Sequence, residues 1–225
     1  GNIVGNNLTL NTTGNVTVDG ITDGNTTNIA STLTINASGS GNVTFATAAS
    51  SVNATLNVLA ANGIDVDENV STTNGDITLD GDSDGSNDGD DAITIAANVT
   101  IAASGNMTLD ATTGNISGVG NVDLDAADGI TINDDFTTNG DTDFNADTDA
   151  AGAGIFTLNN VTLDTQNNPL TLTLADLVLV PNASIVVGNA TFTVNESQNN
   201  GFGVGETTVA GGINISGAEL QSIFV

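Results

Sequence analysis

The feature that most constrains this chain is a short triplet, apolar–threonine–apolar, that recurs from one end of the sequence to the other. Residues 8–10, 16–18, 77–79, 130–132 and 192–194 are examples. Alternation with a period of two, built largely from β-branched residues, predicts short strands with one buried face. The stretches between triplets are rich in Gly, Asn, Asp, Ser and Thr, which favour turns. No stretch has helical periodicity, so we expect an all-β fold.

Longer repeats indicate how these strands are arranged. The segments 63–76 and 129–141 resemble one another at an offset of about 65 residues. Three coils of 20–25 residues would explain this offset, and that size is typical of solenoid repeats. Strands this short would bury little apolar surface between two facing sheets, whereas stacked coils place the apolar side chains of every strand in one continuous core. We therefore predict one all-β domain over residues 1–225, a right-handed parallel β-helix (β-solenoid) of about ten coils, in preference to a β-sandwich or jelly roll.

Composition changes along this predicted rod. Of the 27 acidic residues, 20 lie between positions 65 and 149, so residues 63–149 form an acidic section that carries loops. Residues 168–225 form a more irregular section, which contains both prolines. At ~4.8 Å per coil, ten coils would make a rod of roughly 50 Å. We expect Thr and Asn to form ladders along it and some acidic residues to align as columns of carboxylates.

Charge narrows the range of partners, because the chain has no Lys, Arg or His and a formal net charge of −27. Nucleic-acid binding relies on Lys and Arg to neutralise phosphates, so that class is excluded. Repulsion among the carboxylates opposes folding unless cations screen or bind them, which makes divalent cations the expected partners. No apolar run approaches the ~18–20 residues of a membrane-spanning helix, so we expect no membrane span.

The sharpest local motif is the acidic segment 80–91. Laid on a twelve-residue calcium loop, its carboxylates occupy positions 1, 3, 5, 9 and 12, with a glycine at the tight turn and a backbone carbonyl at position 7. A second segment, 141–149, has alternating oxygens but no closing carboxylate. The predicted Ca²⁺ ligands are Asp80, Asp82, Asp84, Ser86, Asp88 and Asp91 in the first segment and Asp141, Asp143, Asn145, Asp147 and Asp149 in the second. The alternative is a hydrated acidic loop without metal.

Catalysis has few candidate residues. Without His, Cys, Lys or Arg, the chain lacks the usual bases, nucleophiles and phosphate clamps. A pair of carboxylates suffices for glycoside hydrolysis, but there is no Trp or Tyr to stack on sugar rings, so we do not expect an enzyme.

Asn-X-Ser/Thr occurs 16 times. This motif permits glycosylation of a surface protein, although Gly-Asn turns before Thr-centred strands create it for structural reasons as well.

The Gly-Asn turns before Thr-centred strands, the repeated Thr-Thr-Asn-Gly-Asp phrase and the Asp-Ser-Asp insertion resemble the repeats of filamentous-haemagglutinin-like surface proteins. The resemblance covers roughly residues 6–215. These very large secreted bacterial proteins carry a right-handed parallel β-helix, so the resemblance implies an extracellular or cell-surface location. The expected function is a non-catalytic structural rod that self-associates end to end or laterally, or forms part of a giant adhesin. The alternatives are a module that binds glycans or surface receptors and, less favoured, a carboxylate-pair polysaccharide hydrolase.

Overall fold

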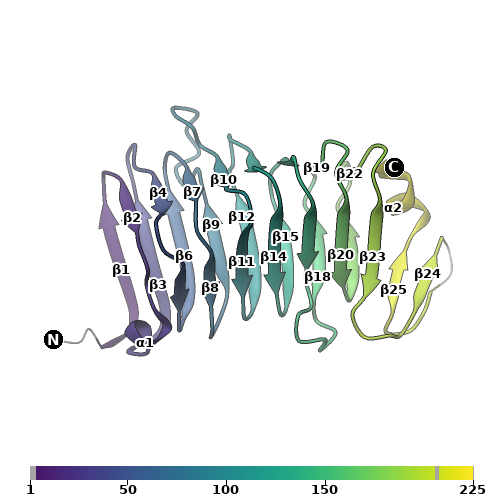
Figure 1. The fold of residues 1–225 in the computed structure, drawn as a ribbon, viewed down its shortest axis with the longest axis horizontal. Coiled ribbons are helices and arrows are strands. Elements are labelled where there is room, and N and C mark those ends of the chain that lie inside the picture. Colours follow the sequence, from purple (N-terminus) through teal and green to yellow (C-terminus); the bar gives the residue numbers. More distant parts are fainter. Residues whose placement is uncertain (1–3, 206–207, 225) are drawn as a thin grey trace.

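The chain winds into a parallel β-helix in the computed structural model, which describes residues 4–205 and 208–224. Within these residues every strand pairing is parallel, and each strand lies beside its equivalent in the next coil. Figure 1 shows the coils standing in a row between the two ends of the chain. Period-two strands therefore bury one face against a shared axis, and the β-sandwich alternative is excluded.

Three sheets form the sides of the solenoid. Sheet A contains β1 (Gly5–Thr12), β3 (Ile29–Ala37), β6 (Thr55–Ala60), β9 (Ile77–Asp80), β12 (Asn106–Asp110), β15 (Gly129–Ile132), β18 (Ile155–Leu158) and β21 (Asp176–Leu179). Sheet B contains β2 (Val16–Val18), β4 (Val43–Phe45), β7 (Ile64–Val66), β10 (Ile93–Ile95), β13 (Ile116–Gly118), β16 (Phe136–Thr138), β19 (Thr162–Asp164), β22 (Ser184–Val186) and β26 (Ile223–Phe224). Sheet C contains β5 (Ser50–Val52), β8 (Val70–Thr72), β11 (Val99–Ala103), β14 (Val122–Ala126), β17 (Thr142–Asn145), β20 (Leu170–Leu174) and β23 (Phe192–Glu196).

One strand from each sheet, in the order A, B, C, makes a coil, and sheet A therefore counts eight coils rather than about ten. The coils are fewer because some are longer than expected. The register of sheet A gives 21 residues from Leu56 to Ile77 but 30 from Ile77 to Met107. The acidic segment 80–91 is inserted in this long coil, between β9 and β10, and Figure 1 shows its loop rising above the neighbouring turns.

The sequence repeat of about 65 residues does not correspond to three whole coils. Its two copies begin at β7 in sheet B and at β15 in sheet A, eight strands further along the chain. With three strands per coil, the offset is two and two-thirds coils. The repeated unit is thus a strand with its turn, and it fits any side of the solenoid because all three sides pack the same kind of apolar face.

The core is one continuous column of aliphatic side chains supplied by alternate residues of every sheet. Three aromatic residues from consecutive strands form a cluster within it. Phe136, Phe144 and Phe156 come from sheets B, C and A, and each is fully buried. The ring of Phe144 lies 5.6 Å from that of Phe136 and 5.7 Å from that of Phe156, measured between centroids. Only four of the seven Phe are fully buried, because β-branched residues and Leu fill most of the interior.

The two ends of the solenoid differ. At the C-terminal end, β24 (Phe202–Val204) pairs with β25 (Ile213–Ile215), helix α2 (Gly217–Gln221) follows, and β26 adds to sheet B. In the first coil, helix α1 (Asp23–Thr26) stands where a sheet C strand would lie, and the inward-facing Leu10 is 47 % exposed. Among the described residues, no helix has the length and hydropathy needed to cross a membrane.

Candidate cation-binding sites

The outer faces of the sheets carry polar side chains in register, as expected for stacked coils. Asp80 and Asp110 are paired at the ends of β9 and β12, and Asp123 is paired with Asp143 across β14 and β17. The predicted alignment of carboxylates between coils is therefore confirmed for two pairs, Asp80 with Asp110 and Asp123 with Asp143. Neighbouring rungs in a sheet lie ~4.8 Å apart, so these like charges are close, and no cationic side chain exists in the chain to separate them.

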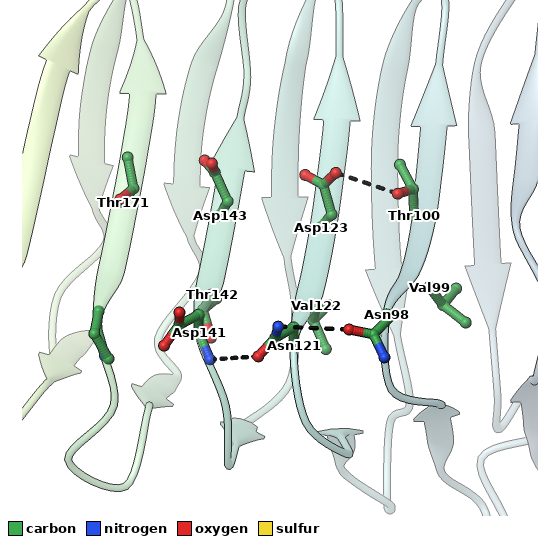
Figure 2. Close-up of a pocket in the computed structure, with 11 residues that line it drawn as sticks. Asn98, Val99, Thr100, Asn121, Val122, Asp123, Asp141, Thr142, Asp143 and Thr171 are labelled. Atoms are coloured by element: carbon green, nitrogen blue, oxygen red, sulfur yellow. Dashed lines mark hydrogen bonds between the residues drawn. The ribbon is translucent and has the colours of Figure 1, made fainter.

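One such column lines a shallow groove of about 420 Å³ on the outer face of sheet C. Figure 2 shows Thr100, Asp123, Asp143 and Thr171 in one row across four strands, with the Thr100 hydroxyl donating to Asp123 at 3.2 Å. A second row, nearer the strand starts, is tied by the side chain of Asn121, which accepts a hydrogen bond from the Asp141 backbone N–H at 3.1 Å. The groove thus offers hydroxyl, amide and carboxylate oxygens at regular spacing.

Burial and neighbouring charges raise the pKa of two carboxyl groups on this face. Burial, followed by the charges of Asp123 and Asp143, raises the pKa of Asp125 to about 6. Burial and the charge of Asp123 also raise the pKa of Asp143. Both shifts mean that the folded state disfavours the charged form, so a bound cation or a proton would stabilise this face.

The acidic segment 80–91 does not fold as a helix-flanked calcium loop, because it joins two strands. Gly85 adopts the left-handed conformation (φ +65°), as expected for the turn position of such a loop. Asp82 and Asp91 turn inward and are 1 % and 3 % exposed, but Asp84, Ser86 and Asp88 point to solvent. The predicted ligands of this segment are therefore divided: Asp82 and Asp91 are buried in the protein, whereas the other three of these five are exposed to solvent.

Two of these inward carboxylates have an oxygen without a partner. The Oδ2 atom of Asp82 accepts hydrogen bonds from the Thr113 backbone N–H at 2.9 Å and from its hydroxyl at 2.7 Å, and Oδ2 of Asp91 accepts from Gly89 N–H at 3.3 Å. The Oδ1 atoms of both residues are buried without any hydrogen-bond donor. A buried charged oxygen that lacks a donor or a cation is costly, so these atoms mark the place where a cation would contribute most.

Two carboxylates that the motif did not include lie at the same corner of the solenoid. Asp110 is the register partner of Asp80, and Asp134 accepts a hydrogen bond from the Ala111 backbone N–H at 2.5 Å. Burial raises the pKa of Asp80 to about 6, with added repulsion from Asp110, Asp82 and Asp134. Burial and the neighbouring Asp110 likewise raise the pKa of Asp134 to about 6. Only the register between coils could have revealed this cluster, because its members are far apart in the sequence.

The second predicted segment, 141–149, is divided between two surfaces. Asp141, Asp143 and Asn145 lie on the sheet C side, and Asp143 lines the groove described above. Asp147 is buried at the next corner, where its carboxylate accepts hydrogen bonds from Gly152 N–H at 3.1 Å and from the Ser197 hydroxyl. The side chain of Asp149 caps its own turn by accepting from Ala151 N–H at 2.9 Å. Among residues 4–205 and 208–224, no three acidic side chains converge as a ready-made metal site.

Asparagine side chains at the corners form ladders between coils, as predicted. Asn62 donates to Asn42 at 2.9 Å, and Asn182 donates to Asn160 at 2.9 Å. Asn42, Asn160 and Asn182 all belong to Asn-X-Ser/Thr motifs, so at these turns the Asn of the motif has a structural role in joining the coils. Glycosylation of Asn42 or Asn160 would leave this ladder oxygen in place but add a sugar at a crowded corner.

Comparison with known proteins adds no relative. No family model, no curated protein and no solved structure matches the chain. The parallel β-solenoid itself is compatible with repeat proteins of the β-helix type.

Proposed function

We propose that the chain is a non-catalytic structural segment of an extracellular surface protein or fibre, a rigid rod whose acidic flank is stabilised by Ca²⁺. Such a rod would join end to end with other copies or form part of a much larger adhesin of the filamentous-haemagglutinin type. One observation carries the proposal: three parallel sheets of seven to nine strands stack side by side around one continuous aliphatic core.

This architecture supports a mechanical role because bending the rod would stretch the hydrogen-bond ladder of at least one side and open the core. Each coil contacts only its neighbours, so length can be added coil by coil without a new fold. The outer faces present mainly Thr, Asn and Asp, which keep the flank hydrated and, through shared negative charge, discourage random sideways aggregation.

The cation in this proposal follows from charge balance. The chain has 27 carboxylates and no cationic side chain, and the buried oxygens of Asp82 and Asp91 have no donor. A bound metal ion would remove this penalty. Ca²⁺ is the favoured ion because it takes six to eight oxygen ligands in flexible geometry, whereas Mg²⁺ demands a near-ideal octahedron and retains its waters.

Thermal unfolding at pH 8 tests the calcium component. We expect the melting temperature to be higher in Ca²⁺ than in EDTA, with a smaller gain in Mg²⁺; equal values in Ca²⁺ and EDTA would contradict it. Electron micrographs in Ca²⁺ would then show filaments or isolated short rods, which distinguishes self-assembly from a segment of a larger protein. Saturable glycan binding or release of sugars from polysaccharides would contradict the purely structural role.

A second candidate function is a module that binds glycans along its flank, and the groove over Asp123 and Asp143 is the observation that favours it. Carboxylate and hydroxyl oxygens repeated at ~4.8 Å could accept and donate hydrogen bonds to successive sugar hydroxyls. A glycan array with Ca²⁺ separates this candidate from the rod, provided that the double variant Asp123→Asn/Asp143→Asn is run beside the unchanged chain. Binding that the double variant loses would support the module, and a blank array would exclude it.

A further inference from the structure

The corner where sheet A turns into sheet B brings two of the predicted ligands, Asp80 and Asp82, together with two carboxylates that lie outside both predicted segments. Its parts come from three consecutive coils. Asp80 and Asp82 belong to the coil of β9, Asp110 to the coil of β12, and Asp134 follows β15 in the third. This inference rests on the proposed function, because it names the residues that would hold the stabilising Ca²⁺.

The turn after β12 is the centre of this corner. Its backbone N–H groups at Ala111 and Thr113 are bound by carboxylates from opposite sides of the stack: Asp134 accepts from Ala111 at 2.5 Å and Asp82 accepts from Thr113 at 2.9 Å. Asp110, which begins the turn, is the register partner of Asp80. Two carboxylates from the neighbouring coils are thus hydrogen-bonded to one turn, whose first residue, Asp110, stands beside Asp80.

A second observation makes this more than a cluster of acidic residues. The side chain of Asp82 is 1 % exposed, and its Oδ1 atom has no hydrogen-bond donor although Oδ2 has two. The residue is anchored to the corner through Thr113, and its backbone N–H donates to the Asp80 carboxylate at 3.2 Å. An anchored, buried carboxylate oxygen without a partner is the group that a cation would ligate first.

We propose that Asp80, Asp82, Asp110 and Asp134 bind one Ca²⁺ ion that cross-links three consecutive coils. Together they offer up to eight carboxylate oxygens, and water completes the shell. Since no three acidic side chains converge in advance, binding requires rotation of the partly exposed Asp80, Asp110 and Asp134 around the fixed Asp82. The solvent-exposed Asp84 and Asp88 of the inserted loop take no part.

Calorimetric melting of matched variants, each in EDTA and in Ca²⁺ at pH 8, tests the assignment. The unchanged chain should gain about 5–10 °C when free Ca²⁺ is about 100 times its Kd. The variants Asp110→Asn and Asp134→Asn should keep their melting temperature in EDTA, because they relieve repulsion, but lose most of the Ca²⁺ gain. The loop variant Asp84→Asn/Asp88→Asn should retain the gain in full. Isothermal titration with CaCl₂ should show one ion per chain and at least tenfold weaker binding for the two corner variants.

The outcomes separate the two proposals. A gain that the loop variant loses and the corner variants keep would overturn the corner site while leaving calcium stabilisation intact. No gain in the unchanged chain, together with no binding heat, would overturn calcium stabilisation and the corner site together.

Discussion

Removing the negative charge of Asp125 should stabilise the protein at high pH. This carboxyl lies half-buried on sheet C, and burial together with Asp123 and Asp143 raises its pKa from 3.8 to about 6. The folded state therefore binds the proton more tightly than the unfolded state does. The resulting stability is fully present below about pH 4 and is lost as the pH rises through about 6. The shift corresponds to ~3 kcal/mol, which solvent screening of a half-exposed group reduces to about 1 kcal/mol.

Urea unfolding of Asp125→Asn in EDTA at pH 5 and pH 8 measures this effect. The variant should be about 1 kcal/mol more stable than the unchanged chain at pH 8, and the difference should shrink at pH 5. Asp19→Asn, at an exposed position on the first coil, serves as the control and should change little at either pH. A variant that is less stable at pH 8, or a difference that grows at pH 5, would refute the view that crowded carboxylates oppose folding.

Three further predictions concern the column and its charge. Phe144→Ala should lower the unfolding free energy by about 3–5 kcal/mol, because the ring is fully buried between two other rings. The control Phe202→Ala, at an exposed site, should have little effect, and similar urea midpoints for the two variants would contradict the continuous core. Gly140→Ala should lower the unfolding free energy by at least ~2 kcal/mol, because its Cβ would lie 2.3 Å from the Gly120 carbonyl carbon. Gly24→Ala, which has open space around the new Cβ, should be tolerated in the same assay. Raising NaCl from 10 to 500 mM at pH 8 in EDTA should increase the melting temperature, because salt screens repulsion among the 27 carboxylates, and a decrease would contradict that reasoning.

Strands and sheet type were predictable from the sequence because the period-two signal is local. Triplets such as residues 77–79 and 130–132 became β9 and β15, with their Thr side chains outward. The side of the solenoid on which each triplet lies was not predictable. The turns between the three sides vary in length, so the repeat of about 65 residues does not tell which sheet each copy belongs to. The two copies begin in sheets B and A.

Helix α2 and half of the acidic corner were not predicted, for different physical reasons. Asp80 and Asp82 were among the predicted ligands, whereas Asp110 and Asp134 were not. Helix α2 carries a local signal, a capping box in which Ser216 and Glu219 bind each other's backbone N–H groups, but five residues are too few for helical periodicity to appear. The corner has no local signal, because Asp82, Asp110 and Asp134 meet only through the register between coils. A linear motif drew attention to the inserted loop, where Asp84 and Asp88 are instead solvated.

Distances between coils test the central claim, a single column of in-register rungs, most directly. The chain has no Cys, so pairs of introduced cysteines can be spin-labelled without background. Thr34, Thr131 and Thr157 lie on the outer face of sheet A. In the register of this sheet, four rung-to-rung steps separate Thr34 from Thr131, and five separate Thr34 from Thr157. Pulsed electron paramagnetic resonance should give mean separations near 19 Å for 34/131 and near 24 Å for 34/157, one rung of ~4.8 Å apart. Separations that do not increase by one rung, or broad distributions at longer distances, would contradict the stacked column.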